Sequence, residues 1–128
     1  MIKQLAITAA LCCSVVHSQT PSAVPVDFPA GAQAPNAAQL ADRLGGQVFT
    51  AKLANGVTWR MDYKPSGYLF FDVSTGQRDT ATWRTEDGRL CLEFRGAFPS
   101  GCTEFRTSDD RLYLKRSSTG EVVALDRK

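Results

Sequence analysis

Turn signals recur about once every ten residues through the second half of this 128-residue chain, which leaves room only for short elements. The signals are Asn-Gly, Pro-Ser-Gly, Asp-Gly and Thr-Gly clusters, and they separate segments rich in β-branched and aromatic residues. Such segments are typical of strands, and connections this short join only antiparallel neighbours. The pattern predicts eight strands, at about 47–53, 57–63, 68–73, 79–85, 89–95, 102–107, 111–116 and 121–126.

A meander of this many strands needs a way to protect its two edges. If the sheet stayed open, each end would present a long row of unpaired backbone groups. Closure removes both edges, so we expect an all-β fold, a small antiparallel up-and-down barrel. A two-sheet β-sandwich is the alternative that the same strands allow.

The chain begins with the pattern of a secretory signal peptide at residues 1–18, with a basic start, an apolar run over 5–16 and a cleavage position before Gln19. A lipid anchor is not expected, because Leu11 precedes Cys12 where a lipoprotein signal needs a small residue. The apolar run is too short to span a bilayer. We therefore expect a periplasmic or secreted protein with no transmembrane segment.

Residues 19–38 follow as a Pro/Ala-rich linker, and residues 39–128 form the barrel domain in this interpretation. The linker holds four of the six prolines, so we expect it to be extended or disordered. A short helix is predicted over 37–44, with Asn36 as its N-cap and Gly45-Gly46 at its end.

Two cysteines remain once the leader is removed, and in an oxidising compartment a Cys91–Cys102 disulfide is the default. One antiparallel register that places these cysteines opposite each other also creates two pairs of opposite charges, and such cross-strand pairs stabilise a sheet. It puts the disulfide on the outer face of the barrel, with Leu90, Leu92 and Phe105 pointing inward. The charge pairs are Arg89 with Glu104 and Asp87 with Arg106.

The first and last hairpins also have a preferred register. A three-residue turn at 54–56 keeps the apolar residues of the first hairpin on one face, with Phe49 opposite Met61 and Ala51 opposite Trp59. The last hairpin pairs apolar with apolar and acidic with basic residues. Its predicted pairs are Leu112 with Leu125, Leu114 with Val123, Arg111 with Asp126 and Arg116 with Glu121.

The strand at 68–73 is apolar on both faces. If Leu69, Phe71 and Val73 face the interior, Asp72 reaches water, and Tyr68 and Phe70 then lie outside. Two alternatives follow for this aromatic pair. Either the helix over 37–44 covers it, or it is a contact patch for a binding partner.

The sequence predicts no catalytic residues, no cofactor and no metal site. The only histidine, His17, is lost with the leader, which excludes a histidine-based triad from the mature chain. A bridged cysteine pair offers neither a nucleophile nor a metal ligand, and no phosphate-binding or dinucleotide fingerprint occurs. The remaining acid–base candidates fall mostly at outward positions or turns, where solvated carboxylates are expected; they are Asp62, Asp72, Asp79, Glu93 and Glu104.

Several short motifs are shared with other proteins: Gly56-Val57-Thr58-Trp59, Gly67-Tyr68, Thr82-Trp83-Arg84, Asp87-Gly88-Arg89-Leu90-Cys91, Gly101-Cys102 and Leu112-Tyr113-Leu114-Lys115-Arg116. Through them the segment from Leu44 to Leu125 resembles a group of small secreted β-domain proteins of proteobacteria. The resemblance implies a disulfide-clipped periplasmic domain and transfers no active site. In architecture the chain is also similar to periplasmic protease inhibitors, which are small barrels with one disulfide.

The formal net charge of +2 falls by one with the leader's Lys3, so no long-range attraction to nucleic acid is expected. We expect a monomer that acts without catalysis as a protein-binding module, either an inhibitor or an envelope accessory factor. The partner would be an unknown envelope protein that contacts either exposed loops or the patch formed by Tyr68 and Phe70. The alternative is a lipocalin-like carrier of a small apolar ligand, which requires a lumen inside the barrel.

Overall fold

The computed structural model describes residues 24–128, and the predicted leader at 1–18 lies outside the described residues. One short helix precedes eight strands, as the capping and turn signals predict. The elements are α1 (Ala37–Leu44), β1 (Val48–Lys52), β2 (Thr58–Tyr63), β3 (Tyr68–Val73), β4 (Arg78–Glu86), β5 (Arg89–Phe94), β6 (Gly101–Ser108), β7 (Arg111–Lys115) and β8 (Val122–Arg127).

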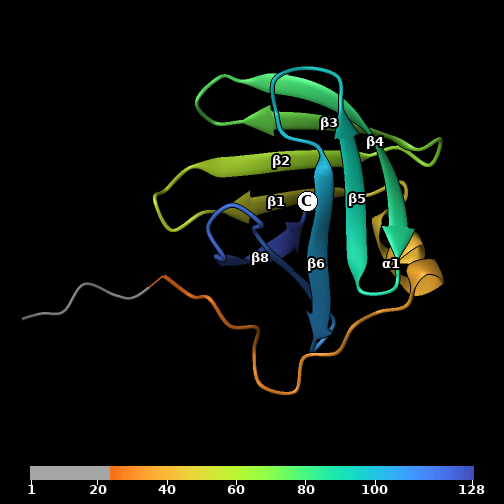
Figure 1. Cartoon of the computed structure of the whole chain (residues 1–128), viewed down its shortest axis with the longest axis vertical. Coiled ribbons are helices and arrows are strands. Elements are labelled where there is room, and N and C mark those ends of the chain that lie inside the picture. Colours follow the sequence, from red (N-terminus) through yellow and green to blue (C-terminus); the bar gives the residue numbers. More distant parts are fainter. Residues whose placement is uncertain (1–23) are drawn as a thin grey trace, which may run out of the picture.

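The strands form a closed antiparallel barrel in which each strand pairs with its neighbours in sequence (Figure 1). Closure depends on the pairing of β1 with β8, through Phe49 with Arg127 and Thr50 with Asp126. This pairing removes the two edges that an open meander would leave. The barrel prediction is therefore confirmed, and the sandwich alternative is wrong.

The predicted registers hold in all three hairpins. Ala51 lies opposite Trp59, as the three-residue turn requires, and Gly56 in that turn has a φ of 89° that favours glycine. Arg89 lies opposite Glu104 and Cys91 opposite Cys102. In the last hairpin both apolar pairs form, and the two charged pairs form as ion pairs, Arg111 with Asp126 and Arg116 with Glu121.

One predicted pair, Asp87 with Arg106, is wrong. β4 ends at Glu86 and β5 begins at Arg89, so Asp87 lies in the turn and not in the ladder. Its carboxylate accepts a hydrogen bond from the backbone N–H of Ala37, at the start of α1. Arg106 instead forms an ion pair with Glu104.

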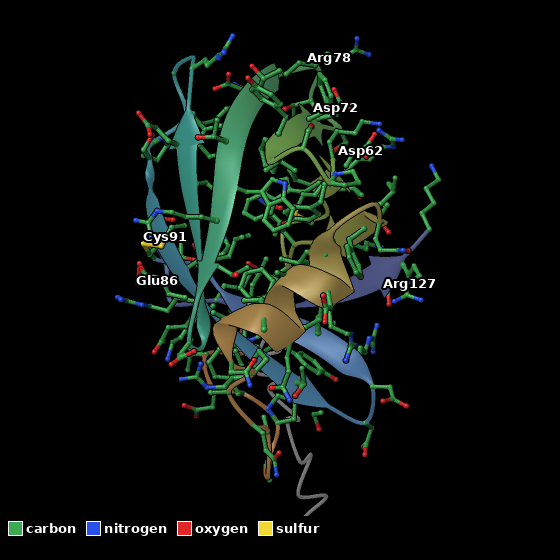
Figure 2. The ribbon with its side chains drawn as sticks, turned by 90° about the vertical axis from the view of Figure 1, so that its right-hand side faces the viewer. Asp62, Asp72, Arg78, Glu86, Cys91 and Arg127 are labelled. Atoms are coloured by element: carbon green, nitrogen blue, oxygen red, sulfur yellow. A yellow bond between two sulfur atoms is a disulfide. The ribbon has the colours of Figure 1, made fainter. Side chains whose placement is uncertain are left out.

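Helix α1 closes one end of the barrel. Asn36 and Gln39 form a capping box at its N-terminus, and Leu40 and Leu44 are fully buried in the same core as the inward side chains of the strands. In Figure 2 the helix lies in front of the strands, across this end. The indole N–H of Trp83 donates a hydrogen bond to the carbonyl oxygen of Lys64. This bond anchors the turn between β2 and β3.

The opposite end is closed by aromatic rings. Phe98, from the loop between β5 and β6, lies 5.2 Å from Phe71 and 5.5 Å from Phe94 between ring centroids. Trp59 packs edge-on against Phe71, and Arg116 stacks over its indole at 5.0 Å. Side chains therefore fill the barrel at both ends and between them. The buried set is Leu40, Leu44, Phe49, Ala51, Leu53, Met61, Tyr63, Leu69, Phe71, Val73, Ala81, Leu90, Phe105, Leu112, Leu114, Val123 and Leu125.

The described part of the linker, residues 24–36, makes one turn at 29–32 and is attached to the barrel wall. Gln33 forms an antiparallel bridge with Thr107 in β6. The carbonyl oxygens of Pro25 and Pro35 accept hydrogen bonds from barrel N–H groups, at 2.7 Å in each case. Because these bonds join distant parts of the chain, this part of the linker belongs structurally to the folded unit.

Because Tyr63 is buried, we expect it to make the stability of the barrel depend on pH in the alkaline range. Its phenol is fully buried, donates to the sulfur of Met61 at 3.6 Å, and has a pKa raised far above the usual value by desolvation. The pKa of Tyr63 is higher in the folded state than in the unfolded state, where it is about 10. The contribution of this group to the free energy of unfolding is therefore fully present below about pH 10 and is lost as the pH rises above that value. We expect Tyr63 to ionise only on unfolding.

A pH titration followed by tyrosinate absorbance and by circular dichroism tests this expectation. The chain has three tyrosines, and the absorbance of the last should appear together with loss of the native signal. In Tyr63→Phe that final step should vanish, and unfolding should move to higher pH. Ionisation of all three tyrosines in a protein with an intact native spectrum would contradict it.

Candidate functional site

The aromatic pair on β3 lies in the open on the outer face of the barrel. Tyr68 is 44% and Phe70 45% exposed, while Leu69, Phe71 and Val73 on the same strand are buried, as predicted. The helix does not cover the pair. Since only three residues separate α1 from β1, the helix stays beside the start of β1, where Leu40 and Leu44 enter the barrel end.

Each exposed ring has a basic side chain beside it. The Lys64 ammonium lies 5.8 Å from the centroid of Phe70, and the Arg95 guanidinium lies 5.9 Å from that of Tyr68. These distances fall within the range of cation–π attraction. The neighbouring positions on β4 are threonines, Thr82 opposite Tyr68 and Thr80 opposite Phe70. An amphipathic surface thus extends across β3 and β4.

A shallow groove of about 640 Å³ runs beside Phe70 over β2, β3 and β4. Asp72, one of its lining residues, forms ion pairs with Arg78 at 3.1 Å and with Arg60 at 3.7 Å. Figure 2 shows Asp62, Asp72 and Arg78 together on this side of the molecule. We call this feature the β2–β4 groove, and its lining residues are Arg60, Asp62, Lys64, Phe70, Asp72, Arg78, Asp79 and Thr80.

Three of the five carboxylates considered from the sequence meet in this groove, but each already has a partner. Asp72 binds two arginines, and Asp62 pairs with Lys64 at 3.1 Å. Asp79 accepts hydrogen bonds from the backbone N–H groups of Thr80 and Gly96, which anchors the loop between β5 and β6. The other two, Glu93 and Glu104, do not line the groove. These contacts give the groove carboxylates a role in orienting cations and a loop.

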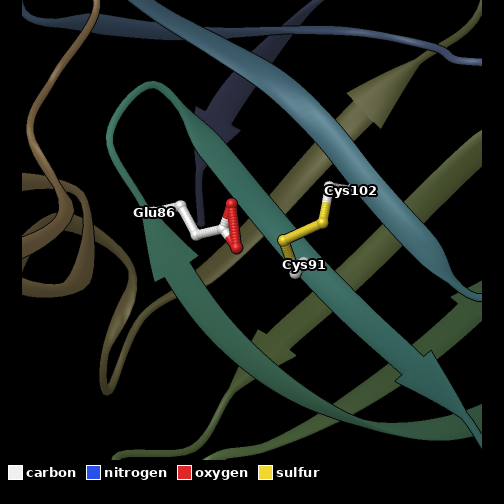
Figure 3. Close-up of side chains that lie close together, drawn as sticks. All are labelled: Glu86, Cys91 and Cys102. Atoms are coloured by element: carbon white, nitrogen blue, oxygen red, sulfur yellow. A yellow bond between two sulfur atoms is a disulfide. The ribbon is translucent and has the colours of Figure 1, made fainter.

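A second cluster lies on the wall formed by β4, β5 and β6, where Cys91 and Cys102 form the predicted disulfide beside Glu86 (Figure 3). The two sulfurs and a Glu86 oxygen lie within 4.8 Å of one another. Because the sulfurs are bonded to each other, they present no thiolate to a metal ion. A hydrogen bond from Arg84 and the charge of Arg89 lower the pKa of Glu86. The cluster therefore fastens three strands together.

Sequence reasoning found the aromatic pair and the disulfide but missed the groove. The missing signal was the register of the hairpin from β2 to β3, which places Arg60 opposite Asp72 and Asp62 opposite Phe70. The Pro-Ser-Gly turn between the two strands could have supplied it, in the way that the other turns supplied theirs. The Arg78 contact would still have required the next turn as well.

Within residues 24–128, no helix has the length and apolar character needed to cross a membrane. Comparison with known proteins found no matching family model, no matching curated protein and no matching solved structure. The functional inference therefore depends on the side chains of this chain alone.

Proposed function

We propose that this protein is a non-catalytic binding module that is exported and docks onto another protein through Tyr68, Phe70 and the β2–β4 groove. The observation that carries the proposal is the exposure of both rings at about 45%, next to a hollow in the surface. An inhibitor or an accessory factor of the cell envelope would both act in this way.

The composition of the surface supports a protein partner. Protein interfaces are enriched in aromatic residues and arginine, and a few such residues supply most of the binding energy. Here two rings lie beside Arg95 and Lys64, with polar and charged residues around them. A rim of this kind excludes water from the central rings once a partner is bound.

The filled interior also favours a function on the outer surface. A carrier would need space inside the barrel, whereas the apolar side chains of the strands pack there and α1 covers one end. Aromatic rings from Phe94 and Phe98 close the other end. The outer surface is then where a ligand has access without displacing core side chains.

Replacement of both exposed rings, Tyr68→Ser with Phe70→Ser, tests the proposal. Wild-type protein on a solid support should retain a defined periplasmic protein, and the purified partner should lose at least ~30-fold in affinity for the double variant, since two interface anchors are removed. Because the rings are half exposed, the free energy of unfolding should fall by only about 1–2 kcal/mol. Calorimetric titration and thermal denaturation measure the two effects.

Tyr113→Ser provides the matched control, because Tyr113 is a half-buried aromatic residue on β7, outside the groove. This variant should bind the partner as the wild type does. Equal losses in both variants would show that binding does not use the β3 face. A wild-type protein that instead carries a small molecule in native mass spectrometry would support the carrier.

A further inference from the structure

We infer that the partner presents an acidic, extended segment with an apolar side chain, which lies in the β2–β4 groove. This inference rests on the proposed function and names the chemistry of the partner. The apolar side chain would contact Tyr68 and Phe70, and its neighbouring carboxylates would bind the basic groups around them.

The two signs of charge in the groove differ in how far they reach into solvent. The basic side chains reach further out, with Arg78 exposed by 83%, Lys64 by 46% and Arg60 by 41%. Asp72 is exposed by 36% and Asp62 by 18%. An approaching segment therefore meets ammonium and guanidinium groups before it meets carboxylates. Asp72 and Asp62 each form an ion pair with these cations.

The ion pairs of the arginines near the rings also favour an acidic partner. Arg78 approaches Asp72 through its Nε at 3.1 Å, and it takes part in no other ion pair within residues 24–128. Arg95 takes part in none of the ion pairs found in that part of the chain, and it lies against Tyr68. A guanidinium matches a carboxylate with two parallel hydrogen bonds. Arg95 therefore has a guanidinium without a carboxylate partner beside the rings, and an acidic segment would supply one.

The shape of the surface favours a polypeptide segment over a lipid surface. Tyr68 and Phe70 lie within a strand on the barrel wall, beside a hollow, and not on a protruding loop. A single extended chain, which places alternate side chains on opposite sides, can enter the groove with one row of side chains.

Fluorescent peptides test the inference on the full mature chain. One alternates glutamate with phenylalanine, and its counterparts carry glutamine or lysine in place of glutamate. Fluorescence anisotropy should show the glutamate peptide binding ~10-fold or more tightly than the glutamine peptide, because charged hydrogen bonds are the stronger ones. That preference should decrease in Arg78→Gln with Arg95→Gln and persist in Arg127→Gln, which lies on β8 outside the groove.

The outcomes separate this inference from the proposed function. The glutamate and glutamine peptides could bind equally well, and the double variant Tyr68→Ser with Phe70→Ser could abolish the binding of both. That result would support the docking face and overturn the acidic partner. If the ring substitutions leave peptide binding unchanged, or if no peptide binds, the docking face and the acidic partner are both overturned. Sedimentation with phosphatidylglycerol vesicles that is lost in the same variants would replace the peptide with a lipid surface and overturn the inference.

Discussion

Replacement of Leu44 by alanine should destabilise the barrel by about 2–5 kcal/mol. Leu44 belongs to α1 in sequence, but its side chain is fully buried in the barrel core together with Leu40. Truncation would leave a cavity at the end of the barrel where few atoms can move to fill it. The free energy of unfolding in urea measures the loss.

Asp42→Ala is the matched control, because Asp42 is exposed on the same helix. Its effect should stay within about 0.5 kcal/mol. Trp83 offers a second signal, since its ring lies next to Gly45 at the end of the helix. If Leu44→Ala and Asp42→Ala had equal effects, the helix would not be part of the core.

Replacement of Glu121 by alanine should cost about 3 kcal/mol. Glu121 is only 4% exposed and is the buried charged side chain among the described residues. Its carboxylate accepts a hydrogen bond from the backbone N–H of Ala54 at 2.8 Å and pairs with Arg116 at 3.5 Å. It therefore joins the turn after β1 to the turn before β8. Its loss leaves the part-buried N–H of Ala54 without an acceptor and Arg116 without a carboxylate partner.

The Arg111–Asp126 pair supplies the comparison, because it is shorter, at 2.6 Å, yet well exposed. Asp126→Ala should cost only about 0.2–1 kcal/mol, since water screens the charges and replaces the lost contact. Urea denaturation of the two variants ranks them directly. A larger loss in Asp126→Ala would show that distance outweighs burial in this barrel.

Much of the fold was readable from local signals. Turn clusters marked the strand ends to within a residue or two, because glycine and proline act through the backbone at their own positions. The alternation in β3 separated inward from outward residues, since side chains in a strand change face at each step. Cross-strand charge and cysteine pairs then set the register between neighbours.

The candidate site was only half readable. Tyr68 and Phe70 could be placed outside. Whether a helix covered them depended on where α1 docks, and the sequence of α1 does not determine that position. The short connection from Leu44 to β1 and the space at the barrel end decided it. Likewise, Asp87 left its expected partner because the start of the helix came within reach.

The sequence by itself determined the number of strands, their antiparallel order, the disulfide and the outward direction of the aromatic pair. These depend on turns, alternation and neighbours in the chain. The sequence favoured closure, and the pairing of β1 with β8 in the tertiary structure decided between the barrel and the sandwich. Only the tertiary structure decided the position of α1 and the attachment of residues 24–36. It alone also brought Arg60, Asp72 and Arg78 together from three strands. The physical reason is that these contacts join residues far apart along the chain, and they form only when the barrel brings them together.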